Sequence, residues 1–258
     1  IDDVTNPATP TLATVTGECS ATATVPSTTD NCSGSITGTT TDPLTYNTQG
    51  THTISWSFDD GNGNVIIVSQ NVVIDDVTNP ATPTLATVTG ECSATASTPS
   101  TTDNCSGTIS GTTTDPLTYN TQGTHTINWS FDDGNGNVII VSQNVVIDDV
   151  TNPVIPTLSD VTGECSATAS TPSTTDNCSG TISGTTTDPL TYNTQGTHTI
   201  NWSFDDGNGN VIIVAQNVVI DDVTNPNTPT LPVVTGECST TVSAPTTTFN
   251  CSLVLPVI

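Results

Sequence analysis

The heptapeptide Ile-Asp-Asp-Val-Thr-Asn-Pro begins at Ile1, Ile74, Ile147 and Ile220, so the chain repeats every 73 residues. No copy holds a set of reactive side chains that the others lack, whereas an enzyme usually needs one asymmetric site. Repetition instead favours a structural array or a multivalent adhesin, which gains reach or avidity with each added copy. We expect three full repeats and one partial repeat, with the boundaries 1-73, 74-146, 147-219 and 220-258.

The charge of the chain excludes two classes of partner. There are 25 Asp and Glu residues and no Lys or Arg, which gives a formal net charge of -25. Nucleic acids and anionic membranes are bound through Lys and Arg, so neither is an expected partner. Carboxylates without cationic partners repel one another, and divalent cations are the expected counter-charge.

No stretch of the sequence approaches the roughly 20 apolar residues of a membrane span, and no secretory leader is visible. Both a secreted protein without its leader and a segment of a longer array would have such a sequence.

The eight cysteines fall into four pairs, and the members of each pair are 13 residues apart. With 4% aromatic residues each repeat has a thin core, and one disulfide per repeat would add about 3 kcal/mol of stability. Zinc is disfavoured because no Cys-x-x-Cys spacing occurs. Disulfides imply an oxidising compartment, so we expect a secreted or cell-surface protein. The predicted bridges are Cys19–Cys32, Cys92–Cys105, Cys165–Cys178 and Cys238–Cys251.

The pattern of apolar residues indicates an all-β chain. Ile54, Trp56 and Phe58 alternate with polar residues, and the turn sequence Asp-Asp-Gly-Asn-Gly-Asn separates them from a second apolar strand. This predicts a β-hairpin, and shorter Thr-rich strands precede it. Six or seven strands per repeat predict a tandem array of small β-sandwich domains. Trp56 is expected in the core, and His52 is expected at the edge of the sandwich.

The run GEC…TTDNCSG, followed by YNTQGTHTISWSFDDGNGN, resembles the hyalin-repeat (HYR) family and related immunoglobulin-like repeats of bacterial surface proteins. The resemblance spans the full repeat. It implies an immunoglobulin-like sandwich with an extracellular role in adhesion or in spacing other domains. Family members often carry a further cysteine pair that joins the first and last strands, and this sequence has none.

Three segments rich in carboxylates and amides recur in each repeat: the linker, the Thr-Thr-Asp-Asn segment and the hairpin turn. In an immunoglobulin-type sandwich the first strand enters at the end that carries the other two segments, so all three should converge. Oxygen ligands of this kind suit Ca²⁺, which we expect at the junctions between domains. The candidate ligands are Asp75, Asp76, Asp103, Asp132, Asp133, Asn135, Asp148, Asp149, Asp176, Asp205, Asp206 and Asn208.

These segments admit other interpretations. The spacing of Asp133, Asn135 and Asn137 matches the opening of a helix-loop-helix calcium loop, but Val138 replaces the required Gly, so that motif is rejected. The hairpin can also be a simple turn and the linker an exposed polar joint. Adjacent Asp132 and Asp133 point in different directions and have no apolar pocket, which disfavours a glycosidase pair.

The sequence therefore predicts a structural rod of an extracellular adhesin or filament, possessing no enzyme activity and stiffened by calcium. The alternative is a multivalent module that binds glycans or proteins. The partners expected are other copies of the chain or neighbouring domains of a longer chain. In the partial repeat Phe249 replaces the usual Asp and the apolar run Leu253-Val254-Leu255 follows, so this segment should leave an apolar face uncovered.

Overall fold

The computed structural model describes residues 2–251 and 254–256. The contacts within the chain define two compact units. The first unit comprises Ile1–Val88, Ala94–Tyr119 and Thr124–Val146, and the second comprises Thr89–Ser93, Asn120–Gly123 and Ile147–Ile258.

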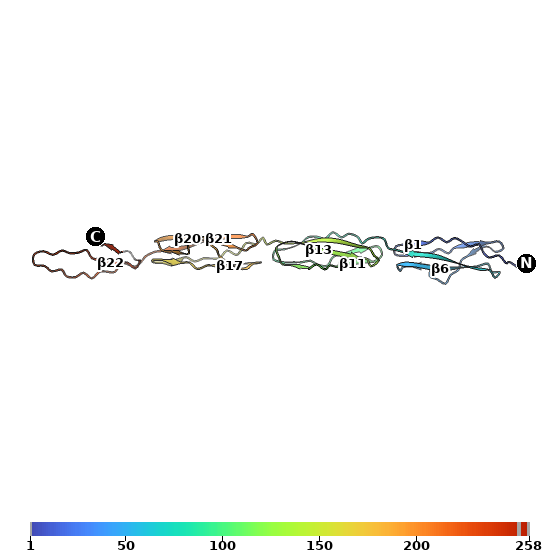
Figure 1. The fold of residues 1–258 in the computed structure, drawn as a ribbon, viewed down its shortest axis with the longest axis horizontal. Helices are drawn as coiled ribbons and strands as arrows, with labels where there is room; N and C mark the ends of the chain where they lie inside the picture. Colours follow the sequence, from blue (N-terminus) through green and yellow to red (C-terminus); the bar gives the residue numbers. More distant parts are fainter. Residues whose placement is uncertain (1, 252–253, 257–258) are drawn as a thin grey trace. The chain divides into compact units, whose positions relative to one another are not determined.

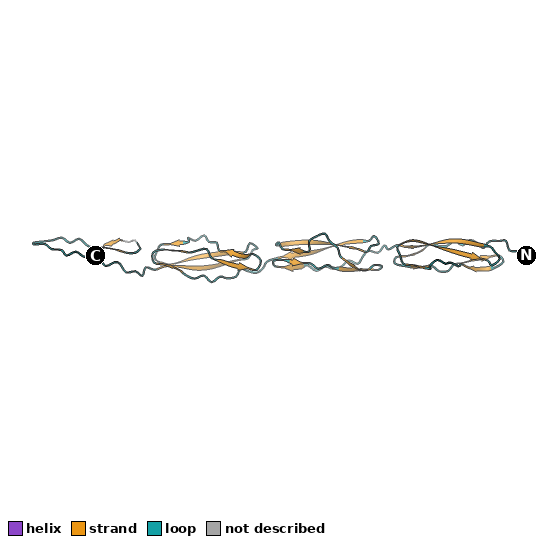
Figure 2. Ribbon diagram, turned by 90° about the horizontal axis from the view of Figure 1, so that it is seen from below, coloured by secondary structure: helices purple, strands orange, loops and turns teal. Residues whose placement is uncertain are grey.

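The described residues form strands and loops only, as the colouring of Figure 2 shows. They contain no helix long and apolar enough to span a membrane. The first repeat has seven strands in its described part: β1 (Val15–Gly17), β2 (Ala21–Thr22), β3 (Ser27–Asp30), β4 (Gly34–Thr37), β5 (Thr45–Tyr46), β6 (Gly50–Asp59) and β7 (Val65–Ile74).

The same series of strands recurs in the second and third repeats. The second has β8 (Val88–Gly90), β9 (Ala94–Thr95), β10 (Ser100–Asp103), β11 (Gly107–Ser110), β12 (Thr118–Tyr119), β13 (Gly123–Asp132) and β14 (Val138–Ile147). The third has β15 (Val161–Gly163), β16 (Ala167–Thr168), β17 (Ser173–Asp176), β18 (Gly180–Ser183), β19 (Thr191–Tyr192), β20 (Gly196–Asp205) and β21 (Val211–Ile220).

Each repeat is a small β-sandwich-like unit. In the first, one sheet has the order β1-β7-β6, with β1 parallel and β6 antiparallel to β7. Figure 1 labels β1 and β6 of this sheet. Two short ladders, β2-β5 and β3-β4, form the other side. The third repeat has the equivalent pairs in the second unit. The expected all-β fold of repeated small sandwiches is confirmed.

The predicted hairpin is confirmed as β6 and β7. Its register runs from Gly50 opposite Ile74 to Asp59 opposite Val65. Gly61 and Gly63 in the turn have φ of 80° and 103°, a region in which residues with a Cβ are strained. The glycines of the turn therefore fix the hairpin and, with it, the position of the neighbouring acidic residues.

The core of the first repeat lies between the sheet and the two ladders. Ile54, Trp56 and Phe58 of β6 alternate inward with polar residues facing outward, and Ala21, Ala23 and Ile36 close the core from the other side. Trp56 is 1% exposed, as predicted, so its ring is not available for stacking on a sugar.

Gln70 satisfies the polar groups of the core, and His52 packs at its edge. The Trp56 indole nitrogen donates to Gln70 Oε1 at 2.9 Å, and Gln70 Nε2 donates to the Ala13 carbonyl at 2.9 Å. The ring of His52 stacks on Tyr46 with the ring centroids 4.4 Å apart. Its Nε2 forms a hydrogen bond with the Thr48 carbonyl oxygen at 2.8 Å, so the prediction of a satisfied histidine at the edge of the sandwich is confirmed.

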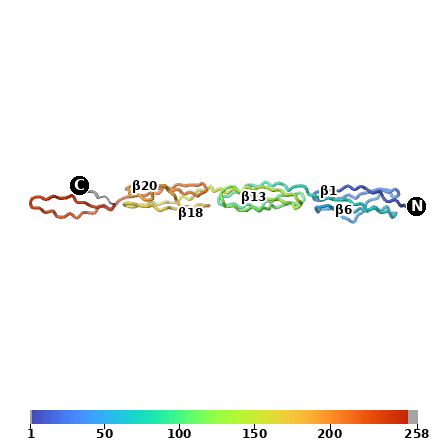
Figure 3. The backbone as a smooth tube through the Cα atoms, viewed as in Figure 1, coloured from blue at the N-terminus to red at the C-terminus, as the bar shows by residue number. Residues whose placement is uncertain are grey.

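The partial repeat has no core of its own among the described residues. It carries the short antiparallel pair β22 (Thr246–Thr248) and β23 (Val254–Pro256), and its trace, red in Figure 3, doubles back as two extended legs. Leu231, Val233 and Val242 are 63%, 89% and 71% exposed, which agrees with an uncovered apolar surface. The side chains of the Leu253-Val254-Leu255 run lie outside the described residues.

Candidate metal centre at the junctions between repeats

Consecutive repeats are joined by disulfides. Cys19 of the first repeat is bonded to Cys105 of the second, within the first compact unit. In the second unit, Cys92 is bonded to Cys178 and Cys165 to Cys251. Each bridge spans 86 residues, which is one repeat of 73 plus the cysteine spacing of 13.

The predicted bridges within repeats are therefore wrong. Cys19 follows β1, whose Gly17 pairs with Ile74 at the last residue of β7. Cys32 lies in the β3–β4 turn, where Ser33 Oγ donates to the Asp60 carbonyl just before β7 begins. The ten residues of β7 separate the two cysteines by about 30 Å, far beyond the roughly 7 Å that a disulfide allows between Cα atoms. Cys32 and Cys238, which were also predicted to be bonded, are free and exposed.

These positions define two ends of each repeat. We call the end that receives the linker and carries the Cys32-type turn the leading end, and the end that carries the Cys19-type loop the trailing end. The loop after β1 is tight, since a Cβ on Gly17 would lie 2.1 Å from the Ser20 carbonyl oxygen. Only glycine fits there, and the turn presents Glu18 and Cys19 to the next repeat.

Glu18 holds the junction of the first two repeats beside the disulfide. Its carboxylate accepts hydrogen bonds from the Thr78 hydroxyl and the Asn104 amide, both at 2.7 Å. Gln49 connects the Glu18 loop to the linker. Its Nε2 donates to the Glu18 carbonyl and its Oε1 accepts from the Asp76 N–H, both at 2.9 Å. The sequence analysis missed Glu18, although the string Gly-Glu-Cys in every copy could have drawn attention to it.

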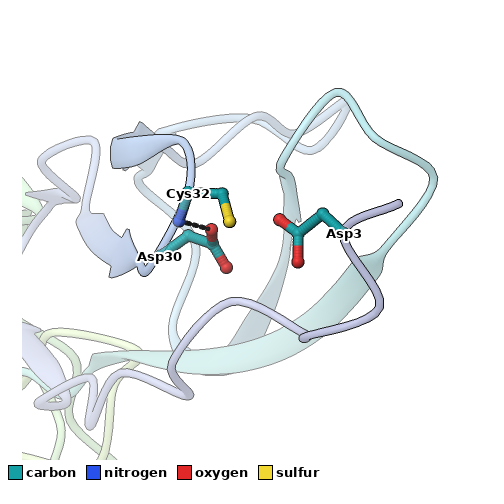
Figure 4. Close-up of side chains that lie close together, drawn as sticks. All are labelled: Asp3, Asp30 and Cys32. Carbon is teal, nitrogen blue, oxygen red and sulfur yellow. Dashed lines mark hydrogen bonds between the residues drawn. The ribbon is translucent and has the colours of Figure 1, made fainter. Parts of the chain in front are cut away.

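The three acidic segments converge as expected at the leading end. One oxygen each of Asp76 and Asp103 and the sulfur of Cys105 lie within 4.8 Å of one another. Two further groups have the same geometry. They are Asp149, Asp176 and Cys178, and Asp3, Asp30 and Cys32. In Figure 4 the side chains of the last group face one another: Asp3 comes from the N-terminal segment, Asp30 from the end of β3 and Cys32 from the turn that follows.

The hairpin turn holds the linker carboxylate in place through its two asparagines. Asn135 Nδ2 donates to Asp76 Oδ2 at 3.0 Å, and Asn137 Nδ2 donates to the Asp76 carbonyl at 2.9 Å. In the second unit Asn208 Nδ2 donates to Asp149 Oδ2 at 3.0 Å. Both predicted asparagines, Asn135 and Asn208, thus contact the acidic group through the amide nitrogen.

Asp133 and Asp206 are buried beneath the hairpin turns, where their carboxylates accept hydrogen bonds from main-chain N–H groups of the turn. Burial raises the pKa of the Asp133 carboxyl, but hydrogen bonds from the Asn135 N–H and from the side chain and N–H of Asn137 outweigh it, so this pKa lies below its usual value. Asp206 is surrounded in the same way and its pKa is also lowered. Both carboxylates therefore carry a negative charge while being 7% exposed.

One carboxylate oxygen in each group is buried without a hydrogen-bond partner: Asp30 Oδ1, Asp103 Oδ2 and Asp176 Oδ2. The other oxygen of Asp176 accepts from the N–H groups of Cys178 and Ser179 at 2.8 and 2.9 Å. Asp176 is 9% exposed and its neighbour Asp149 is 4% exposed. A buried carboxylate oxygen without a donor is costly unless a cation approaches it, and the chain has no Lys or Arg to do so.

Eight of the twelve predicted ligands lie outside these groups, and four of the eight are the hairpin residues described above: Asp133, Asn135, Asp206 and Asn208. The other four, Asp75, Asp132, Asp148 and Asp205, are exposed. Asp132 Oδ1 and Asp205 Oδ1 each accept the N–H of the glycine two residues later, at 2.8 Å. Their role in the described structure is to close the hairpin turn.

The sulfurs differ between the groups. Cys105 and Cys178 are in disulfides, so neither offers a thiolate to a metal. Cys32 is a free thiol, and its pKa is raised by desolvation and by the negative charge of Asp3. The donor set shared by all three groups is therefore oxygen only, which suits a hard cation such as Ca²⁺.

Comparison with known proteins adds distant resemblances. No protein-family model matches the chain, so the similarity to hyalin repeats remains a resemblance. No curated protein matches it either.

Several solved structures of tandem β-domains resemble the chain. The protocadherin gammaB4 extracellular domain is 13% identical over 83% of this chain and 49% of its own length, with a TM-score of 0.31. The human desmocollin-1 ectodomain is 12% identical over 87% of this chain and 60% of its own, with a TM-score of 0.24. A three-domain immunoglobulin segment of titin is 7% identical over 81% of this chain and 95% of its own, with a TM-score of 0.22.

The chain thus spans about half of the protocadherin structure that it matches. The strand pairing described above shows the all-β fold class.

Proposed function

We propose that the chain is a load-bearing structural segment of an extracellular adhesin or filament, with repeats joined by disulfides and stiffened by Ca²⁺ at the junctions. The observation that carries the proposal is the pairing of the cysteines. Each bridge links one repeat to the next, and the bridges overlap along the sequence because Cys92 precedes Cys105.

This overlap shortens the covalent path along which a pulling force travels. From Cys19 the path crosses to Cys105, runs back along the chain to Cys92 and crosses again to Cys178. The 13 residues from Cys92 to Cys105 span at most about 45 Å when fully extended. An unbridged repeat of 73 residues would extend to about 250 Å. A repeat that loses its fold under force therefore gains little length.

Calcium would stiffen the same junction. The buried, unpartnered oxygens of Asp103 and Asp176 point to a missing positive charge, and Asp76 and Asp149 lie beside them. These residues would hold the ion, and water or further carbonyls would complete the six to eight ligands that Ca²⁺ takes. Because the linker supplies Asp76 and the next repeat supplies Asp103, a bound ion would hold the linker against that repeat.

The alternative function, a multivalent module for glycans or proteins, has less support. Trp56, Trp129 and Trp202 are each 1% exposed, and the three tyrosines stack on histidines. Aromatic rings that could stack on a sugar are thus occupied in every full repeat. A catalytic role finds no support either, since the buried carboxylates recur in each repeat and are tied to main-chain N–H groups.

Single-molecule stretching of the 258-residue chain by its two ends tests the proposal. We expect the oxidised protein to lack the large extensions of an unfolding domain, and the same molecules to show steps of about 200 Å per repeat after reduction. The triple variant C19S/C92S/C165S should behave as the reduced protein does, and C32S/C238S, which alters only the free thiols, as the oxidised one. Steps of about 200 Å in the oxidised protein would refute the load-bearing role.

A further inference from the structure

Within residues 1–258 the two free cysteines lie on a leading end and on a trailing segment that carry complementary groups. In each filled junction the trailing end supplies a Glu and a Cys, and the leading end supplies a Thr, an Asn and a Cys. Glu91 binds the Thr151 hydroxyl and the Asn177 amide in the same way that Glu18 binds its partners, and Glu164 binds the Thr224 hydroxyl and the Asn250 amide.

The leading end of the first repeat presents the same three groups. The Cys32 thiol is hydrogen-bonded to Asp3 but is not in a disulfide. Thr5, Asn31 and Cys32 are exposed, and neither the Thr5 hydroxyl nor the Asn31 amide is hydrogen-bonded within the described residues. Asp30 and Ser33 hold the turn in the conformation that it has in the filled junctions, since Asp30 Oδ2 accepts from the Cys32 N–H at 2.7 Å. The half-junction is therefore preformed.

The complementary half lies in the partial repeat. Glu237 and Cys238 are exposed and occupy the positions that Glu18 and Cys19 have in the first repeat. Glu237 makes no hydrogen bond in the part of the chain that the structure describes. Residues 220–258 supply the groups for two of the junction contacts, the glutamate and the disulfide.

We infer that a second copy of this chain docks head to tail, with its Glu237 on Thr5 and Asn31 and its Cys238 bonded to Cys32. Three filled junctions in the same molecule show that these residue types form this contact. The inference uses the junction chemistry of the proposed load-bearing role, but its test measures assembly rather than extension, so either can fail alone.

The covalent step is an ordinary thiol–disulfide exchange with a small disulfide such as oxidised glutathione. One cysteine thiolate attacks the small disulfide and releases one small thiol. The second cysteine then attacks the mixed disulfide and releases the other. The two cysteines lose two protons and two electrons in total, and the small disulfide is reduced to two thiols.

The test uses the oxidised 258-residue chain with C32S and C238S as matched variants. Neither variant alone can form the Cys32–Cys238 bridge, whereas their mixture can form it once and stop at a dimer. We expect disulfide-linked dimers in the mixture with oxidised glutathione, monomers in each variant alone, and longer chains in the unmodified protein. Mass spectrometry should identify Cys32 joined to Cys238.

A second variant separates docking from chance oxidation. E237A removes the carboxylate that would bind Thr5 and Asn31 and leaves both thiols in place, so dimer formation in its mixture should slow. Dimers of C238S alone through Cys32–Cys32, at the rate of the mixture, would overturn the inference. It would also be overturned by a mixture that stays monomeric although alkylation shows both free thiols to be reactive, or by an E237A mixture as fast as its parent.

Discussion

Cys92 and Cys105 belong to one repeat and lie 13 residues apart, yet each is bonded to a different neighbouring repeat. The first reaches forward to Cys178 and the second back to Cys19. The 13-residue segment between them is therefore the shortest covalent path across the repeat. Each of its ends lies at a junction with a neighbouring repeat.

Mapping of the disulfides is the most direct check. Proteolysis under non-reducing conditions should release one peptide pair that contains Cys19 and Cys105 and another that contains Cys92 and Cys178. In the monomer, alkylation before digestion should label Cys32 and Cys238 only. A recovered Cys92–Cys105 peptide would contradict the arrangement of the junctions.

Removal of the unpartnered carboxylate should weaken calcium binding. D103N and D176N each replace a buried oxygen that lacks a donor, so we expect calorimetry to show roughly tenfold weaker binding at the altered junction. D132N is the matched control, because Asp132 is exposed and serves only the hairpin turn. Equal binding by D103N and D132N would exclude the proposed site.

At the last junction a carboxylate can be added rather than removed. Phe249 stands where the other repeats have Asp30, Asp103 and Asp176, and it lines a cavity with Asp222, Cys165 and Cys251. The substitution F249D restores the second carboxylate beside Asp222. We expect calorimetry to detect one additional calcium site in F249D, whereas F249N, which adds no charge, should bind as the unmodified chain does.

Acid should destabilise the repeats through the hairpin carboxylates. The pKa of Asp133 is lowered in the folded state by the hydrogen bonds that it accepts, so its charged form is favoured by folding. Its contribution is complete above the unfolded value of about 4 and is lost as the pH falls through the lower folded value. The melting temperatures of the wild type and of D133N should therefore differ by a constant amount between about pH 5 and 7 and converge below about pH 4.

Convergence at low pH is specific to this carboxylate. D132N, one residue away and exposed, should follow the pH dependence of the wild type throughout. A difference between the wild type and D133N that grew as the pH fell would contradict the sign of the shift.

The buried tryptophan depends on its glutamine. Gln70→Leu leaves the Trp56 indole N–H and the Ala13 carbonyl without partners, and we expect a loss of about 1–3 kcal/mol in the free energy of unfolding of that repeat. Denaturant titration measures it. The exposed Gln49 is a useful comparison, because Q49L alters the junction and leaves the core intact.

Sequence periodicity predicted the parts of the fold that are set by local physics. The alternation from Ile54 to Phe58 and the glycines after Asp60 determine a hairpin, its register and its buried face, and these appear as expected. The convergence of the linker with the Asp103 turn was also predictable, because it follows from where the first strand of a sandwich begins.

The disulfide partners could not be deduced in this way. Spacing along the chain shows which cysteines recur together, but not that Cys19 and Cys32 lie at opposite ends of a ten-residue strand. Both cysteines of the partial repeat suggested a local bridge, although Cys251 pairs with Cys165. The same limit hid Glu18, whose partners Thr78 and Asn104 are 60 and 86 residues away.

Every bridge joins one fixed position of a repeat to another fixed position of the next, 86 residues later. Recombination between near-identical copies that removes or duplicates a whole 73-residue segment therefore leaves each interior cysteine with a partner. An insertion or deletion of any other length would break the pairing at the site of the change. The gene can thus alter the length of the protein in whole steps without losing the bonds that hold it together.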